Sequence, residues 1–139
     1  MTLLHPFVDP AALDAGVRRT IAGVAAGREP FEYRLFEMAT WPLAVYIAVR
    51  PTDPFVRLQR DLQAAFPDFP IYGEAGGFEF VPHVTIADSD HVAEPRLPGD
   101  RAWRALPQIA RASAIDVIGK GADGRWRLIW RVPLGRMPA

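Results

Sequence analysis

The residues with the clearest chemical potential lie together in the segment 80–87, which reads Phe-Val-Pro-His-Val-Thr-Ile-Ala. In a β-strand, side chains two positions apart lie on the same face, so we expect His83 and Thr85 to point the same way. An imidazole that exchanges a proton near neutral pH would then lie beside a hydroxyl that can hold an oxyanion. This pair suits phosphate chemistry. A lone His-x-Thr is also compatible with a strand-end histidine bonded to a loop carbonyl.

The sequence holds 3 histidines in all, and the other two are His5 and His91. In a strand over 2–8, Thr2 and Leu4 would share one face and His5 would point to the other. We therefore expect His5 to be structural or at the surface. His91 lies in a polar loop, and we expect it to be solvated.

The loop after the histidine strand also offers metal-ligand atom types. Asp88, Asp90 and His91 could be combined with His83, since carboxylates and imidazoles are proper ligands. Their spacing fits no familiar metal motif, so a capped polar loop is the expected structure and no metal is predicted.

Aromatic residues supply two weaker candidates for ligand contact. Tyr72 precedes the histidine strand and could stack on a nucleobase, or it could be an ordinary loop tyrosine. In 125–131, arginines alternate with Trp126, Leu128 and Trp130, so the apolar residues would share one face. Aromatics beside arginines can bind single-stranded nucleic acid. A hairpin with a buried aromatic face and solvated arginines explains the pattern equally well.

The elements that must position these residues alternate in type. Helices are predicted from the Asp9-Pro10 cap to Gly27, over 53–66 and over 101–109. Strands are predicted over 2–8, 31–38, 43–49, 78–87, 114–118 and 126–132. A strand–helix–hairpin order occurs twice, at 2–50 and at 83–132. The pattern favours an α+β sandwich of two related halves.

Length and composition limit the classes of protein to consider. The 139 residues are enough for one domain, and the formal net charge of +0 argues against a long nucleic-acid footprint. The lack of cysteine excludes disulfides, thiolate zinc sites and a cysteine nucleophile. The longest apolar run, 43–49, is far shorter than the roughly 20 residues of a membrane helix. With no signal peptide visible, we expect a cytoplasmic protein.

Three parts of the chain resemble the bacterial 2′-5′ RNA ligase-like branch of the 2H phosphoesterase family. One is Phe-Pro-Asp-Phe-Pro-Ile-Tyr-Gly at 66–73, followed by Val-Pro-His-Val-Thr-Ile-Ala at 81–87. Another is the opening 2–8, which is similar to the end of the family's first motif, His-Val-Thr-Leu-Leu-Tyr-Pro-Phe. The last is the closing hairpin, at 124–128 and 133–135. The resemblance implies that 1–139 form a single domain of this family.

The family is named for two His-x-(Thr/Ser) motifs that face each other across a cleft between two pseudo-symmetric antiparallel sheets, with helices outside. The resemblance implies that His83 is one general acid or base and that Thr85 and Thr2 hold phosphate oxygens. Tyr72 stays the candidate for contact with the substrate. The implied substrate is a 2′,3′-cyclic phosphate or 2′-5′ phosphodiester of a nucleotide or RNA end, which is hydrolysed or ligated. No cofactor is implied, and the default oligomeric state is a monomer.

The sequence departs from the family pattern at its first residues. Thr2 matches the first motif's threonine and Met1 its central valine, so the histidine would stand before Met1. His5 falls where the family commonly has tyrosine. We expect a start codon placed too late, because GTG encodes valine internally but methionine at a start. The 15 arginines against one lysine are typical of a GC-rich genome, where GTG is frequent.

Two other functions stay open at this stage. One is a degenerate family member that binds a nucleotide or RNA end without turnover. The other is a small interaction domain whose cleft is vestigial.

Overall fold

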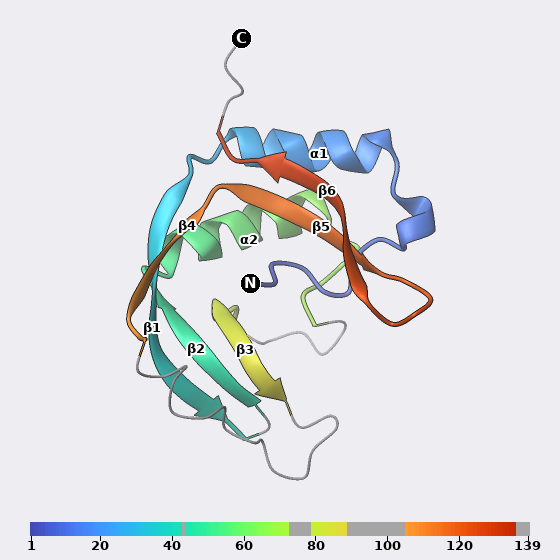
Figure 1. Ribbon diagram of the computed structural model, residues 1–139. Helices are drawn as coiled ribbons and strands as arrows, with labels where there is room; N and C mark the ends of the chain where they lie inside the picture. Colours follow the sequence, from blue (N-terminus) through green and yellow to red (C-terminus); the bar gives the residue numbers. More distant parts are fainter. Residues whose placement is uncertain (43, 73–78, 89–104, 136–139) are drawn as a thin grey trace.

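The computed structural model describes residues 1–42, 44–72, 79–88 and 105–135, and Figure 1 shows their arrangement. The helices are η1 (Pro10–Ala12), α1 (Ala15–Ala26) and α2 (Asp53–Ala65). The strands are β1 (Phe31–Trp41), β2 (Ala44–Arg50), β3 (His83–Asp88), β4 (Gln108–Ala112), β5 (Ala114–Lys120) and β6 (Trp126–Pro133). Neither α-helix in this part of the chain is long and apolar enough to cross a membrane.

The expected α+β fold with two antiparallel sheets is confirmed. One sheet has four strands in the order β3-β2-β1-β4, and the other pairs β5 with β6. Every pair is antiparallel. Only Ser113 separates β4 from β5, so one nearly continuous segment passes from the first sheet to the second (Figure 1).

One face of the four-stranded sheet packs against α2. The buried side chains of β2 are those at alternating positions, Val45, Ile47 and Val49. On β1, the rings of Phe31 and Tyr33 lie edge-on to Phe55 of α2, with centroid distances of 4.8 and 5.0 Å. Leu35 continues this side and lies opposite Val49. We call the other side, which carries Tyr46, Ala48 and Arg50 of β2, the open face.

The predicted hairpin is confirmed as β5 and β6, but the faces of β6 differ from the expectation. Trp130 lies opposite Val117 and Leu128 opposite Ile118, so Ile129 is an extra residue in a β-bulge. The bulge turns Trp130 toward the core, whereas Leu128 is 53% exposed. The prediction that the apolar residues of this strand share one face is therefore wrong.

The strand predicted over 2–8 is also wrong, because this segment has no regular secondary structure. Leu3 and Leu4 are consecutive, yet both pack against the core, as does Phe7. A strand would send consecutive side chains to opposite faces. Pro6 in addition lacks the N–H that a sheet ladder requires.

Helical structure begins at Asp9, as predicted, but in two steps. The Asp9 Oδ1 accepts a hydrogen bond of 2.7 Å from the Ala11 N–H and so caps the short η1. Asp14 then caps α1, with its Oδ1 2.8 Å from the Val17 N–H. Gly27 is the C-cap of α1, as expected.

One further boundary agrees with the prediction and one differs. α2 begins at Asp53, as predicted, with Thr52 at the cap position and Asp53 as a first-turn acid. The helix predicted over 101–109 is wrong at its end, since β4 begins at Gln108. Pro107 disfavours helical backbone at the residue before it, which suits an extended chain there. Residues 101–104 lie outside the described part.

A single core connects α1, α2 and the hairpin. Its buried members are Ile21, Ala25, Leu58, Leu62, Ile115, Val117, Val132 and Leu134. The Arg28 Nε donates to Asp61 Oδ2 at 2.7 Å and joins the end of α1 to α2 at the rim of this core. α2 therefore contributes to two contacts at once, one with the four-stranded sheet and one with α1 and the hairpin.

We predict that Leu62→Ala lowers the free energy of unfolding by about 2–5 kcal/mol, because Leu62 is 4% exposed and its removal leaves a cavity. Leu128→Ala is the matched control: it deletes the same atoms from a side chain that is 53% exposed. Urea unfolding of both variants measures the difference. Equal losses would contradict the assignment of the core.

Candidate functional site

His83 and Thr85 lie on the open face of the four-stranded sheet. Thr85 is opposite Tyr46, and His83 is opposite Ala48. Directly opposed residues of antiparallel strands share a face, so all four side chains leave the sheet on the side away from α2. The sequence prediction that His83 and Thr85 point the same way agrees with this register.

A hydrogen bond determines which ring nitrogen of His83 is available for chemistry. Nδ1 lies 2.7 Å from the carbonyl oxygen of Val81. A carbonyl oxygen can only accept, so Nδ1 carries the proton and donates it. In the neutral ring the lone pair is therefore on Nε2, and Nε2 is the atom that can take a proton from a reacting group.

Two aromatic rings surround His83. Trp41, the last residue of β1, stacks on Tyr46 with a centroid distance of 4.0 Å and an interplanar angle of 26°. The His83 ring stands edge-on to both, with its centroid 4.7 Å from that of Trp41 and 5.6 Å from that of Tyr46. These contacts fix the plane of the imidazole. Trp41 is still 38% exposed, so its ring is also accessible to a ligand.

The two threonines with expected roles differ in their surroundings. Thr85 is exposed on β3, with its hydroxyl on the same face as the imidazole. Thr2 is also exposed, but it lies in the irregular N-terminal segment rather than in a strand. Among the described residues, no hydrogen bond joins Thr2 to His83 or Thr85.

Tyr72 and His5 meet through their backbones. The Tyr72 N–H donates to the His5 carbonyl at 2.8 Å, and Tyr72 has a positive φ of 60°. The Tyr72 side chain is 42% exposed, and its partial burial raises the pKa of the phenol. His5 lies edge-on to Trp126 at 6.4 Å between ring centroids. His5 thus packs against the hairpin rather than within the His83 ring cluster.

Part of the predicted polar loop, including Asp90 and His91, lies outside the described residues. Within the part of the chain that the structure describes, no group of three or more histidine, aspartate or glutamate side chains could hold a metal ion.

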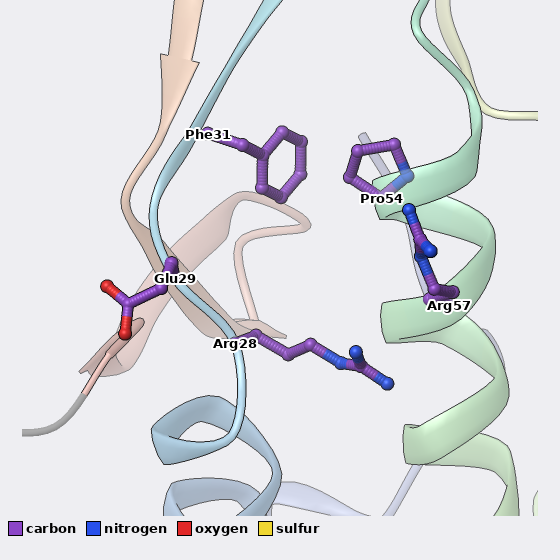
Figure 2. Close-up of a pocket in the computed structure, with 5 residues that line it drawn as sticks. All are labelled: Arg28, Glu29, Phe31, Pro54 and Arg57. Atoms are coloured by element: carbon purple, nitrogen blue, oxygen red, sulfur yellow. The ribbon is translucent and has the colours of Figure 1, made fainter.

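A shallow pocket of about 180 Å³ lies on the other side of the sheet from His83. Figure 2 shows its lining residues, which come from the connection between α1 and β1, from the start of β1 and from α2: Arg28, Glu29, Phe31, Pro54 and Arg57. Phe31 belongs to the face that packs against α2. Arg28 is already bonded to Asp61. We therefore do not include this pocket in the candidate site.

Sequence reasoning missed four residues of the open face. Trp41 and Tyr46 contact His83. Arg50 lies two residues beyond Ala48, the residue opposite His83, and Arg34 lies opposite Arg50. The alternation of β2 could have placed Tyr46 and Arg50 on the face opposite the valines. The positions of Trp41 and Arg34 depend on pairing across strands, which a single strand pattern does not contain.

The site thus combines, on one face of an α+β sheet, an imidazole whose Nδ1 is hydrogen-bonded to a carbonyl and a neighbouring threonine hydroxyl. A family model of the 2′-5′ RNA ligase superfamily matches residues 1–118. The chain belongs to this superfamily, and the resemblance of its motifs to that family is confirmed.

A solved structure supports the fold. The crystal structure of TT0787 of Thermus thermophilus superposes with a TM-score of 0.59 at 15% sequence identity. The match covers 90% of this chain and 74% of that one. At this identity the similarity concerns the fold alone. A search of curated proteins finds no match.

We predict that neutral His83 is protonated at Nδ1. ¹⁵N NMR of ring-labelled protein with the imidazole in its neutral form should give a protonated signal for Nδ1 and an unprotonated signal for Nε2. His5, whose ring is hydrogen-bonded to no carbonyl of the described residues, is the internal reference. An Nε2–H signal for His83 would contradict the hydrogen bond to Val81.

Proposed function

We propose that this protein is a 2H-type phosphoesterase that acts in the cytoplasm on a 2′,3′-cyclic phosphate or a 2′-5′ phosphodiester at a nucleotide or RNA end. The observation that carries the proposal is the His83–Thr85 pair on one exposed sheet face, with Nδ1 held by Val81 and Nε2 free. Superfamily membership supports the same class of substrate.

In the hydrolytic direction, a water oxygen bonds to phosphorus while one ring P–O bond of the cyclic phosphate breaks. One proton leaves the water for a base, and another is given to the departing ribose oxygen by an acid. His83 serves as one of these two groups through Nε2. The Thr85 hydroxyl donates to a non-bridging oxygen as negative charge develops on it, and Thr2 has the same role on the other side.

The second acid–base group is a histidine that we place directly before Met1 in a longer form of the protein. The hairpin has room for an additional strand, since in the described part of the chain β5 and β6 pair only with each other. Two strands alone are marginal, and a further strand could pair with an edge of the hairpin. The side of β5 and β6 away from the core is also apolar and open: Ile118, Trp126 and Leu128 are 53, 55 and 53% exposed.

A second candidate function is binding of a nucleotide or RNA end without turnover. It is favoured by one observation: the residue before Thr2 is Met1, so this chain has one of the two motif histidines. Loss of one acid–base group costs on the order of 10²–10⁴-fold in rate. The phosphate-holding groups of the open face would still bind the ligand.

We predict that a version extended upstream through the expected histidine hydrolyses 2′,3′-cyclic nucleotides, and that this chain does so about 10²–10⁴-fold more slowly. His83→Ala in the extended version should reduce kcat by a similar factor, because the remaining acid–base group cannot serve both sides of phosphorus. Hydrolysis followed by chromatography of the nucleotide products measures both rates.

His5→Ala is the matched control, as it removes a histidine that contacts Trp126 and not His83. It should leave kcat unchanged. If His5→Ala and His83→Ala reduce turnover equally, the assignment of His83 is wrong. If neither version turns over substrate but both bind 3′-AMP, the second candidate replaces the enzyme.

A further inference from the structure

Two arginines lie directly opposite each other on the open face. Arg34 of β1 pairs with Arg50 of β2, and both side chains are exposed. Arg50 is two residues from Ala48, the residue opposite His83, so the arginines share the face of the imidazole. The guanidinium carbon of Arg50 lies 4.7 Å from the centroid of the Phe36 ring, which holds it against the sheet.

This arrangement is unfavourable for the fold by itself. Like charges directly opposite each other in an antiparallel pair repel and destabilise the sheet. Among the described residues, no carboxylate forms an ion pair with Arg34 or Arg50. Glu32 and Glu37 of β1 share the open face, but Glu32 lies opposite Arg111 and Glu37 opposite Ala48, so neither is directly opposite Arg34 or Arg50. An anionic ligand between the two guanidinium groups would relieve the repulsion.

The arginine pair lies at a separation that distinguishes between ligands. From His83 to Arg50 the path crosses one strand spacing of about 4.8 Å and two residues of about 3.4 Å each, so the Cα atoms are about 8 Å apart. Arg34 lies one strand further away, about 12 Å from His83, so a single phosphate held by His83 and Thr85 would contact both arginines only with their side chains fully extended. A second phosphate, one nucleotide along a chain, fits the pair better.

We propose that Arg34 and Arg50 bind a second phosphate of the ligand, so that the preferred ligand is a single-stranded RNA end of two or more nucleotides rather than a mononucleotide. The inference rests on the proposed function, since the first phosphate is the one at His83. Along β2 the order on this face is Tyr46, Ala48, Arg50. The bound RNA strand would therefore run from the His83 position toward Arg50, away from the Trp41–Tyr46 stack.

The neutral net charge of the protein is consistent with so short a footprint. A site for one additional phosphate needs two local cations and not a basic surface. Planar guanidinium groups suit it, because each can donate two parallel hydrogen bonds to phosphate oxygens.

The test compares two ligands that the protein does not turn over. Binding to this chain is measured by fluorescence anisotropy with a 5′-labelled adenosine tetranucleotide that ends in a 3′-phosphate, and unlabelled 3′-AMP serves as competitor. The tetranucleotide should bind at least about tenfold more tightly than 3′-AMP. Arg34→Gln and Arg50→Gln should each weaken the tetranucleotide about tenfold and leave 3′-AMP unchanged.

Salt dependence provides an independent readout. The double variant, which loses the second phosphate contact, should reduce the slope of log affinity against log salt by about 0.7, the value for one phosphate on a single strand, and each single variant by part of that. Arg19→Gln on α1 removes the same charge from an exposed position outside the open face and should change neither affinity nor slope. Arg34→Gln should not lower the melting temperature, because it removes a like-charge pair.

The proposal is overturned if both variants bind the tetranucleotide like the parent protein, or if they weaken 3′-AMP equally. It is also overturned if the tetranucleotide and 3′-AMP bind alike. Failure of the proposed catalysis would give a different result. The tetranucleotide would still bind more tightly than 3′-AMP, and the arginine variants would still weaken its binding, but neither version of the protein would hydrolyse cyclic phosphates. Hydrolysis of mononucleotide and tetranucleotide cyclic phosphates with equal kcat/KM, in parent and variants, would preserve the enzyme and remove the second phosphate site.

Discussion

The packing of α2 against one face of the four-stranded sheet determines which side chains are left for chemistry. Phe55 lies between the rings of Phe31 and Tyr33, while Leu58 and Leu62 of the same helix enter the core with α1 and the hairpin. Because side chains alternate between the two faces of a strand, packing Val45, Ile47 and Val49 of β2 against α2 places the intervening side chains on the opposite face. Tyr46 and Arg50 belong to this second set of β2 side chains, and His83, Trp41 and Arg34 lie on the same face through their strand pairing with β2.

Local sequence patterns predicted helices and strands correctly where the hydrophobic periodicity is strong. They failed where tertiary contacts determine the local structure. The alternating apolar residues of β2 and the stripe of α2 predicted those elements within a few positions. The segment 2–8 has strand-like composition, but its consecutive residues Leu3 and Leu4 both pack against the core, which forms only when the whole chain folds. In β6, one bulge at Ile129 puts Trp126 and Trp130 on opposite faces, and no pattern within that strand encodes a residue that is extra relative to its partner.

The candidate site was predictable only in the parts that are close in sequence. Parity alone put His83 and Thr85 on one face, and the register agrees. Trp41 and Arg34 reach the same face through pairing across strands that are more than 30 residues from His83 in the chain, and β1 itself contains an irregularity between Leu35 and Glu37. That irregularity shifts the phase of β1, so the alternation that buries Phe31 and Tyr33 would misplace Trp41 if it were extended along the strand.

The hydrogen bond from His83 to Val81 constrains any mechanism that uses this face. With Nδ1 committed to a carbonyl, all proton transfer at His83 passes through Nε2, so the ring is a base when neutral and an acid when charged. It cannot be both for one phosphodiester, since the attacking and leaving oxygens lie on opposite sides of phosphorus. A partner group in the opposite protonation state is therefore a requirement of the chemistry itself, independent of the family pattern. Without that partner, the same face has the properties of a binding site: a hydroxyl, two aromatic rings and two arginines that lie directly opposite each other.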